Sequence, residues 1–376
     1  MDYAKLALEK HKELKGKITI QPRDIVDSKE KLSTYYSPGV GAVSSYVAKH
    51  PEETRDYTWL NNNVAVVSDG SAVLGLGNIG PQGALPVMEG KAMLFKGFAN
   101  IDAVPIVLDV HTADEIVAAV KAIAPSFGGI NLEDIAAPLC FEIEERLKAD
   151  LSIPVMHDDQ HGTAIVTLAG LINATKITGR ELKDCKIVLV GAGAAGVAIA
   201  KLIHLYAGAA IVTVDSKGIV TRDRTDLNTE KQILAQFNKD QQGGTLTDAV
   251  KDADVFIGVS QAGLLTADMI KTMADQPIIF AMANPVPEIM PDVAKEAGAA
   301  IVATGRSDFP NQVNNSLAFP GIFRGALDHG VKAITDQHKI AAAEAIAALV
   351  AEPTVDKIIP GPFDDGVVEA VAHVIR

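Results

Sequence analysis

The chain has 376 residues, of which 48 % are hydrophobic and 22 % are charged, and its formal net charge at pH 7 is −13. This length exceeds what one hydrophobic core usually supports, so the sequence predicts two globular domains. The excess of acidic residues disfavours nucleic acid and anionic membranes as partners, because both repel a negatively charged surface.

The N-terminal segment and the cysteines bear on location. The segment "MDYAKLALEKHKELKGK" carries charges throughout, whereas a signal peptide needs an apolar run. The longest apolar run begins at Ile187 and stops at Lys201, which is too short to span a bilayer. Cys140 and Cys185 are too few for a disulfide framework or a thiolate metal site. We therefore expect a cytoplasmic protein with free thiols.

Short apolar runs alternate with longer helical patterns through the first half of the chain, which predicts a parallel sheet covered by helices. The predicted strands lie at 63–68, 103–110, 128–134 and 153–158, and the predicted helices lie at 83–97, 112–124, 138–148 and 162–176. We place the domain boundary at the start of the last helix, so that the first domain comprises residues 1–160 and the second comprises residues 161–376.

The second half opens with a pattern of strand, glycine-rich turn, helix and strand at 186–215. Further strands are predicted at 253–260, 277–284 and 300–305, and further helices near 336–351 and 365–375. This alternation is typical of a dinucleotide-binding domain. The predicted fold class is α/β, with an N-terminal parallel-sheet domain and a C-terminal Rossmann-type domain that binds NAD(P)⁺.

Two segments, "GLGNIG" at 75–80 and "GAGAAG" at 191–196, match the glycine pattern of a dinucleotide-binding turn. The second follows a buried strand, precedes a helix, and is followed by Asp215, whose carboxylate can accept hydrogen bonds from the adenosine ribose. After the first segment, Pro86 and two further glycines would interrupt a helix. We predict that the nucleotide contacts lie in the second segment, at Gly191, Gly193, Ala194, Ala195, Gly196 and the following Asp215. The first segment is either a plain connection or a place where the backbone passes close to a substrate or partner.

Two acidic pairs, Glu133 with Asp134 and Asp158 with Asp159, end predicted strands of one parallel sheet, where ligands of such folds gather. Four carboxylates brought together would repel one another unless cations lie among them. Oxygen ligands of this kind suit Mg²⁺ or Mn²⁺. The pattern alone leaves open that these residues are solvent-exposed helix N-caps, with Asp134 as the plainest case.

The segment "HDDQH" at 157–161 superficially resembles the zinc-binding motif of metalloproteases, which requires both histidines on one helix. Pro154 lies just upstream and Gly162 just downstream, and residues 153–156 have the pattern of a strand. We therefore expect no zinc protease.

Several longer segments resemble the malic enzymes, in the compact form of bacteria and archaea. They are "YYSPGVG" (35–41), "VSDGSAVLGLGNIGPQGALPVMEGKAMLFK" (67–96), "NLEDIAAP" (131–138), "HDDQHGTA" (157–164), "ANPVPEI" (283–289) and "NQVNNSLAFPGIFRGAL" (311–327). The resemblance runs in order from about residue 15 to about residue 350. It implies oxidation of L-malate by NAD(P)⁺ and decarboxylation to pyruvate, with Mg²⁺ or Mn²⁺. It also implies a homodimer or higher homo-oligomer.

The resemblance implies a role for each matched residue. The metal ligands would be Glu133, Asp134 and Asp159. The general base would be Lys91, the general acid would be Tyr36, and Asp158 would be the carboxylate beside the lysine. Asn284 and Asn315 would bind the substrate, and Asn314 would lie near the nicotinamide. The segment 75–80 would lead to the helix that presents Lys91. Without the resemblance, Lys91 would read as a solvated helix residue and Tyr36 as a packed aromatic residue.

Two features keep alternatives open. Larger malic enzymes have an arginine that binds the substrate carboxylate at the position where this chain has Ala72. Ser71, the asparagines or another residue must therefore make that contact here. Asp215 favours NAD⁺ over NADP⁺ by repelling a 2′-phosphate, while Lys217 would weaken that repulsion.

A lyase that decarboxylates oxaloacetate and a nucleotide-sensing regulator are the alternative functions. The sequence does not show whether Tyr36 acts in its own subunit or in a neighbour's.

Overall fold

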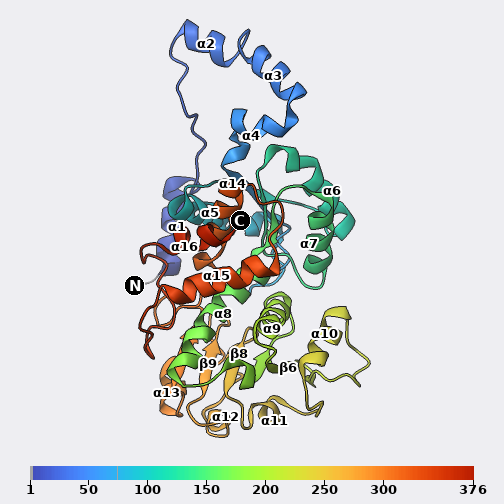
Figure 1. The fold of residues 1–376 in the computed structure, drawn as a ribbon, viewed down its shortest axis with the longest axis vertical. Helices are drawn as coiled ribbons and strands as arrows, with labels where there is room; N and C mark the ends of the chain where they lie inside the picture. Colours follow the sequence, from blue (N-terminus) through green and yellow to red (C-terminus); the bar gives the residue numbers. More distant parts are fainter. Residues whose placement is uncertain (1–2, 74) are drawn as a thin grey trace.

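The computed structural model describes residues 3–73 and 75–376, in which two parallel-sheet halves lie along the long axis and an arm of helices extends from one end (Figure 1). Within these residues the first sheet has the strand order β2-β1-β3-β4, all parallel. Its strands are β1 (Asn63–Ser68), β2 (Asp102–Val107), β3 (Ile130–Leu132) and β4 (Val155–His157). Each predicted strand of the first half is confirmed.

Alternate residues of β1 face opposite layers of helices, as expected for the two-residue period of a strand. Val64 and Val66 pack in the same hydrophobic cluster as Met88 and Phe95 of α5 (Gly80–Ala99). Ala65 and Val67 belong to the cluster on the other face, which includes α6 (Ala113–Ile123) and α7 (Leu139–Asp150). The sheet is thus covered on both faces, which is typical of parallel sheets.

The second sheet has the order β10-β9-β8-β5-β6-β7 in the described part of the chain. Its strands are β5 (Lys186–Val190), β6 (Ala210–Asp215), β7 (Gly218–Ile219), β8 (Val255–Gly258), β9 (Ile278–Ala281) and β10 (Ile301–Thr304). The two-residue β7 pairs antiparallel with β6, so the prediction of parallel sheets is wrong at this edge. Because β5 lies between β6 and β8, its carboxyl end is the switch point at which Rossmann-type folds bind ligands.

Two helix predictions are corrected at their N-terminal ends. Helix α5 runs through Pro86, which was expected to interrupt it. Pro86 lies on the exposed side, while Ala84, Met88 and Phe95 are buried at helical spacing on the other side, so packing outweighs the local cost of proline. Helix α8 (Asp158–Ile177) starts four residues before the predicted start.

Helix α8 is the central element that joins the two halves (Figure 1). It is buried on almost every side and packs against α9 (Ala194–Ala207) and α15 (Asp336–Ala348). It passes without a break through the predicted boundary at residues 160 and 161, and that boundary stays a prediction.

The C-terminal helices return to the first half. The rings of Phe319 and Phe323, on α14 (Phe319–His329), lie 4.7 and 5.5 Å from the ring of Phe95. Helix α16 (Val367–Val374) packs against α14 and α15. The remaining helices of the second half are short, namely α10 (Thr229–Phe237), α11 (Leu246–Val250), α12 (Ala267–Ile270) and α13 (Pro291–Glu296).

The N-terminal helices make few contacts with the rest of the chain. Helices α2 (Lys29–Tyr35) and α3 (Val40–Lys49) contain no buried residue, and with α4 (Thr54–Tyr57) they form the arm at the top of Figure 1. Helix α1 (Tyr3–Leu14) lies on the body instead. None of the helices in the described residues is both long and apolar enough to span a bilayer.

Candidate active site

Three carboxylates meet where β3 and β4 end side by side. Glu133 and Asp134 follow β3, and Asp159 lies in the first turn of α8, directly after β4. Each offers an oxygen atom within 4.8 Å of the others. The backbone N–H of Asp134 donates to Oδ2 of Asp159 at 2.7 Å, which ties the two strand ends together. The sheet therefore assembles the predicted oxygen cluster.

The alternative that these residues are exposed helix caps is wrong. Glu133 and Asp134 are about 5 % exposed and Asp158 is fully buried. Helix α7 begins only at Leu139, with Pro138 as its N-cap, so Asp134 caps no helix there. Burying several carboxylates is unfavourable unless cations balance them. The arrangement thus suits a bound cation better than a solvated surface.

Lys91 supplies one cation to this cluster. Its Nζ atom lies 2.6 Å from Oδ2 of Asp158 and 2.8 Å from Oε1 of Glu133. The ring of Phe319 covers it, with 4.3 Å between Nζ and the ring centroid. Lys91 is only 7 % exposed, so the alternative that it is a solvated helix residue is wrong. The structure brings together the proposed base, the neighbouring carboxylate and the candidate metal ligands.

The charges in this cluster shift one another's pKa values. Burial favours the neutral amine of Lys91, but the charges of Asp158, Glu133 and Asp159 outweigh it and raise the pKa of Lys91. Burial raises the pKa of Asp158 to about 7, against the opposing charge of Lys91. Burial likewise raises the pKa of Asp159 to about 6. Burial and the mutual charges thus raise the pKa of the base and of both carboxyl groups.

Of the three predicted asparagines, Asn315 contacts the cluster directly. Asn315 donates from Nδ2 to Oδ2 of Asp158 at 2.6 Å, so it is part of the cluster. Asn314 accepts the backbone N–H of Ser316 and caps the short 3₁₀ helix that begins at Asn315. Asn284 is exposed on the loop that follows β9.

The segment 75–80 passes close to Asn284. A Cβ atom at Gly75, whose φ is +75°, would lie 2.8 Å from the carbonyl oxygen of Asn284. A side chain there would therefore force the loop and Asn284 apart. This agrees with the interpretation that 75–80 is a close backbone approach that leads into α5 and Lys91.

Tyr36 is not brought to Lys91 within the chain. Tyr36 directly follows α2 and is 68 % exposed, whereas Lys91 is on α5. Helix α2 lies on the arm and α5 lies in the body (Figure 1). The alternative that Tyr36 is a packed aromatic residue is also wrong. Any role of Tyr36 in the chemistry requires another surface to meet the arm.

The second glycine segment has the geometry expected of a nucleotide turn. It joins β5 to α9, which begins at Ala194. A Cβ atom at Gly196 would lie 1.8 Å from the carbonyl oxygen of Gly191, so only glycine allows this close packing. Gly193 is exposed and nothing lies within 4 Å of a Cβ placed there. The helix N-terminus is thus open to a phosphate group.

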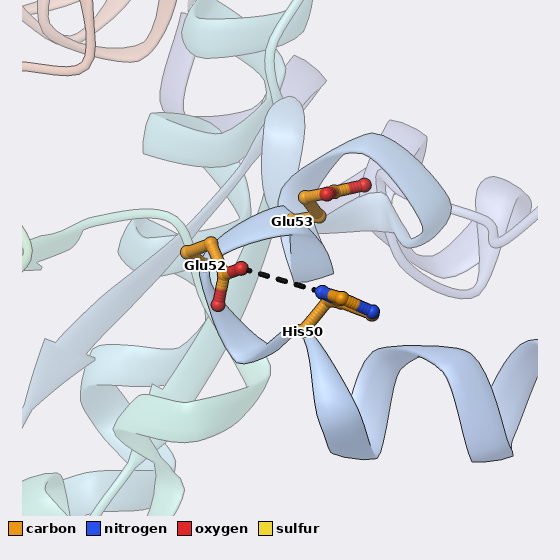
Figure 2. A group of neighbouring side chains, drawn as sticks. All are labelled: His50, Glu52 and Glu53. Carbon is orange, nitrogen blue, oxygen red and sulfur yellow. Dashed lines mark ion pairs between the residues drawn. The ribbon is translucent and has the colours of Figure 1, made fainter.

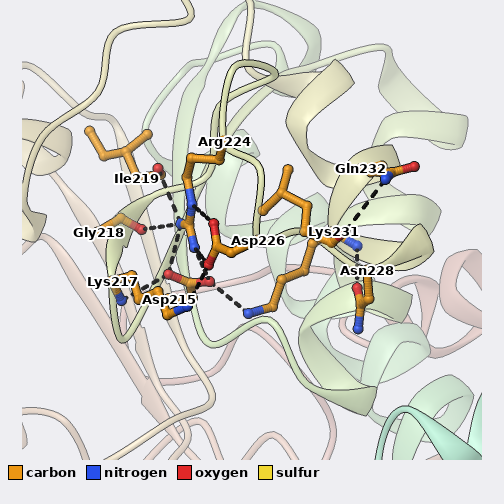
Figure 3. Close-up of polar contacts among 10 residues, drawn as sticks. Asp215, Lys217, Gly218, Ile219, Arg224, Asp226, Asn228, Lys231 and Gln232 are labelled. Atoms are coloured by element: carbon orange, nitrogen blue, oxygen red, sulfur yellow. Dashed lines mark hydrogen bonds and ion pairs between the residues drawn. The ribbon is translucent and has the colours of Figure 1, made fainter.

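Asp215 ends β6 as predicted, and two basic side chains of its own chain bind its carboxylate. Arg224 and Lys231 both donate to its carboxylate, and these contacts are drawn in Figure 3. Lys217, the residue expected to soften its charge, reaches Asp226 with its side chain and meets Asp215 only through its backbone N–H. Arg224 and Lys231 were not recognised from the sequence, because they follow Asp215 by nine and 16 residues in no known pattern.

Ser71 does not replace the missing arginine at Ala72. Its hydroxyl donates to Oδ1 of Asp69 at 2.6 Å and accepts the backbone N–H of Ala136 at 2.9 Å. The hydroxyl is therefore committed to holding the loops around the cluster. Ala72 itself contributes a backbone N–H to the carbonyl of Asp134.

The segment 157–161 begins helix α8, and its second histidine pairs with a glutamate. Asp158 to His161 do lie in the first turn of α8, so the expectation that this segment is not helical is wrong. His161 instead pairs with Glu144 through Nε2 at 2.8 Å, and the backbone N–H of His157 donates to the same carboxylate at 3.0 Å. Glu144, on α7, was not recognised from the sequence because it lies in an ordinary helical pattern. Among the described residues, the two histidines do not form a shared metal-ligand group.

A second acidic group lies on the arm (Figure 2). His50, Glu52 and Glu53 could together approach a metal ion, and His50 pairs with Glu52 at 3.6 Å. Glu53 already accepts the hydroxyl of Tyr46, whose ring lies against His50. These side chains are exposed or half-buried, so local packing accounts for the group.

Comparison with known proteins matches both halves. The family model "Malic enzyme, N-terminal domain" matches residues 15–148, and "Malic enzyme, NAD binding domain" matches residues 160–365. A bifunctional malic/malolactic enzyme of Bacillus subtilis is 57 % identical over 98 % of this chain and 91 % of its own. An NAD-dependent malic enzyme of Geobacillus stearothermophilus is 53 % identical over 96 % of this chain and 76 % of its own.

A solved structure and further relatives agree. The crystal structure of an NAD-dependent malic enzyme from Thermotoga maritima superposes with a TM-score of 0.95, at 51 % identity and with 98 % of each chain covered. Relatives named NADP-dependent malic enzymes also match. Proteins named for either nucleotide thus share this sequence pattern.

Proposed function

We propose that this chain, which belongs to the malic enzymes, carries out the oxidative decarboxylation of L-malate at the cluster around Lys91. The reaction yields pyruvate and CO₂ and reduces NAD(P)⁺. The observation that carries the assignment to this cluster is the buried Nζ of Lys91 between Asp158 and Glu133, beside three convergent carboxylates. The relatives do not favour the alternative of a lyase that only decarboxylates oxaloacetate.

The residues divide the chemistry among them. Lys91 takes the proton from the C2 hydroxyl of malate. Asp158 holds the Lys91 amine in place and is itself held by Asn315. Asn284 and Asn315 hold the substrate, and Asn314 lies near the nicotinamide. The Phe319 ring excludes water from one side of the amine, which strengthens its interactions with the carboxylates.

The donor set fits Mg²⁺ or Mn²⁺. Glu133, Asp134 and Asp159 offer three carboxylate oxygens and no sulfur or imidazole ligand, which suits a hard cation. When bound, the ion acts as a Lewis acid on the substrate oxygens and balances the buried negative charge. That balance matters for Lys91, because the same carboxylates raise its pKa and hold its proton.

Tyr36 acts as the general acid from a second copy of the chain in this proposal. The arm carries exposed apolar side chains, namely Ile25, Val26, Leu32, Tyr35, Val40, Val43 and Tyr46. A surface of this kind is typical of a protein interface. We therefore propose a homodimer or higher homo-oligomer, in which each arm reaches the cluster of a neighbouring subunit.

We also propose a nucleotide site, a division of the chain into two domains and a location for the protein. The nucleotide lies along Gly191, Gly193, Ala194, Ala195 and Gly196, with NAD⁺ as a cofactor and NADP⁺ as an alternative. The first domain, residues 1–160, supplies the metal and catalytic residues, and residues 161–376 supply the nucleotide site. The two free, buried thiols, Cys140 and Cys185, support a cytoplasmic location.

The test is an assay of NAD(P)H formation with purified protein, L-malate and Mn²⁺, with pyruvate measured in parallel. The proposal expects one pyruvate for each reduced nucleotide, and no reaction after chelation of the metal. Release of pyruvate from oxaloacetate without any oxidation of malate would contradict it and support the lyase alternative.

A further inference from the structure

The carboxylate that ends β6 is fully occupied by donors from its own chain. Oδ1 of Asp215 accepts the backbone N–H of Lys217 at 2.9 Å and Nη1 of Arg224 at 2.9 Å. Oδ2 accepts Nη2 of Arg224 at 3.0 Å and Nζ of Lys231 at 2.6 Å. A carboxylate has about four acceptor positions, so none remains for the hydroxyls of a ribose.

Arg224 is equally committed, which makes this arrangement rigid. Its Nε and Nη2 atoms donate to Asp226 and its Nη1 atom also approaches the carbonyl oxygens of Gly218 and Ile219 (Figure 3). The side chain is 15 % exposed. Bidentate contacts of guanidinium with two carboxylates are among the stronger polar interactions in proteins. A ribose hydroxyl would therefore not readily displace Arg224.

The charge at this position is reversed from that of an NAD⁺-selective site. Arg224 and Lys231 touch Asp215, and Lys217 pairs with Asp226, so three cations accompany two carboxylates. Burial opposes the ionisation of Asp215, but the donors outweigh it and lower its pKa to about 2. The carboxylate is thus charged but neutralised, and it cannot repel a 2′-phosphate as a lone aspartate would.

Lys231 retains donors for a ligand. Its ammonium group has three N–H donors, of which Asp215 takes one, and its side chain is 25 % exposed. It lies in the first turn of α10, where the helix N-terminus also favours an anion. A phosphate on the adenosine ribose would find both the ammonium group and the positive end of the helix.

We propose that Arg224 and Lys231 set the nucleotide specificity of this chain, by withdrawing Asp215 from the ribose and offering Lys231 to a 2′-phosphate. The enzyme then accepts NADP⁺ as well as NAD⁺. This inference rests on the proposed function only in placing the nucleotide at the 191–196 turn. Arg224 is a positioning residue, and Lys231 is the group that contacts the phosphate.

The experiment compares kcat/KM for NADP⁺ and NAD⁺ in the wild type, in Arg224→Gln, in Lys231→Met and in the control Lys271→Met. Lys271 is an exposed lysine on the same half of the molecule that pairs only with Asp268 among the described residues. The wild type is expected to use both nucleotides within about tenfold of each other. Arg224→Gln should shift the ratio about tenfold or more toward NAD⁺, because the charge of Asp215 loses one of its two cationic partners and an acceptor position opens.

Lys231→Met should raise KM for NADP⁺ about tenfold with little change in kcat, while Lys271→Met leaves both unchanged. Direct titration of each nucleotide by calorimetry, without malate, separates this inference from the proposed reaction. A wild type that binds NAD⁺ more than about 100-fold tighter than NADP⁺ would overturn it, as would an unchanged ratio in Lys231→Met. If Arg224→Gln does not fold, the ratios of kcat/KM for NADP⁺ and NAD⁺ in the wild type and in Lys231→Met still test the proposal.

Discussion

The carboxyl edge of the first sheet and the N-terminal arm hold the two sets of residues that we propose for the reaction, and they differ most in burial. Lys91, Glu133 and Asp158 are buried within one chain and fixed by contacts of 2.6 to 2.8 Å. Tyr36 is exposed on a helical arm without buried residues. The first region is assembled within one chain, whereas in our proposal a second copy of the chain covers the other.

The largest expected effect tests the buried region. Lys91→Ala should lower kcat for malate oxidation by about 10²- to 10⁴-fold, because it removes the proposed base for the hydroxyl proton. Lys96→Ala, on the same helix but exposed and paired with Asp102, is the matched control. Nucleotide binding, measured by calorimetry, should be unchanged in both variants. Equal activity in Lys91→Ala would remove Lys91 as the base.

A smaller effect is expected at the candidate metal ligands. Asp159→Asn should weaken Mn²⁺ binding about 10- to 100-fold, because one of three carboxylate oxygens loses its charge. Asp150→Asn, an exposed carboxylate paired with Lys121, is the control. Mn²⁺ titration of each variant by calorimetry checks this. The same affinity in Asp159→Asn and the wild type would place the metal elsewhere.

The pH dependence of metal binding should be smaller still. Burial raises the pKa of Asp159 to about 6, so this carboxylate takes up a proton as the pH falls from 7.5 to 5.5. A proton must leave before the oxygen can bind the metal, so the Kd for Mn²⁺ should rise about 3- to 10-fold over this range. Calorimetry at the two pH values measures it. A constant Kd would show that Asp159 is ionised throughout.

Features with a local sequence pattern were predictable, whereas features that depend on tertiary packing were not. The strands, the glycine turn and the convergence of Glu133, Asp134 and Asp159 were predictable, because buried strands and their carboxyl ends leave a local pattern. The start of α8 at Asp158 and the continuity of α5 through Pro86 were not, since tertiary packing decides both. No helix was predicted in the arm, although its segment 35–41 is part of the family resemblance.

Long-range contacts were the least predictable part. The pairing of Asp215 with Arg224 and Lys231, and of Glu144 with His161, depends on where loops and helices meet in three dimensions. The sequence motif correctly placed Asp215 at the end of its strand. It could not show that donors of the same chain would occupy the acceptor positions of this carboxylate, because no local sequence spacing indicates those contacts.

The most direct test of the divided site is complementation between subunits. Tyr36→Phe and Lys91→Ala should each be nearly inactive alone, since one removes the proposed acid and the other the proposed base. If the arm of one copy serves the cluster of another, mixed dimers contain one site with both wild-type residues. Mixing equal amounts and allowing subunits to exchange should then restore about a quarter of the wild-type activity. If mixing restores no activity although mass spectrometry shows mixed dimers, Tyr36 does not act in a neighbouring subunit.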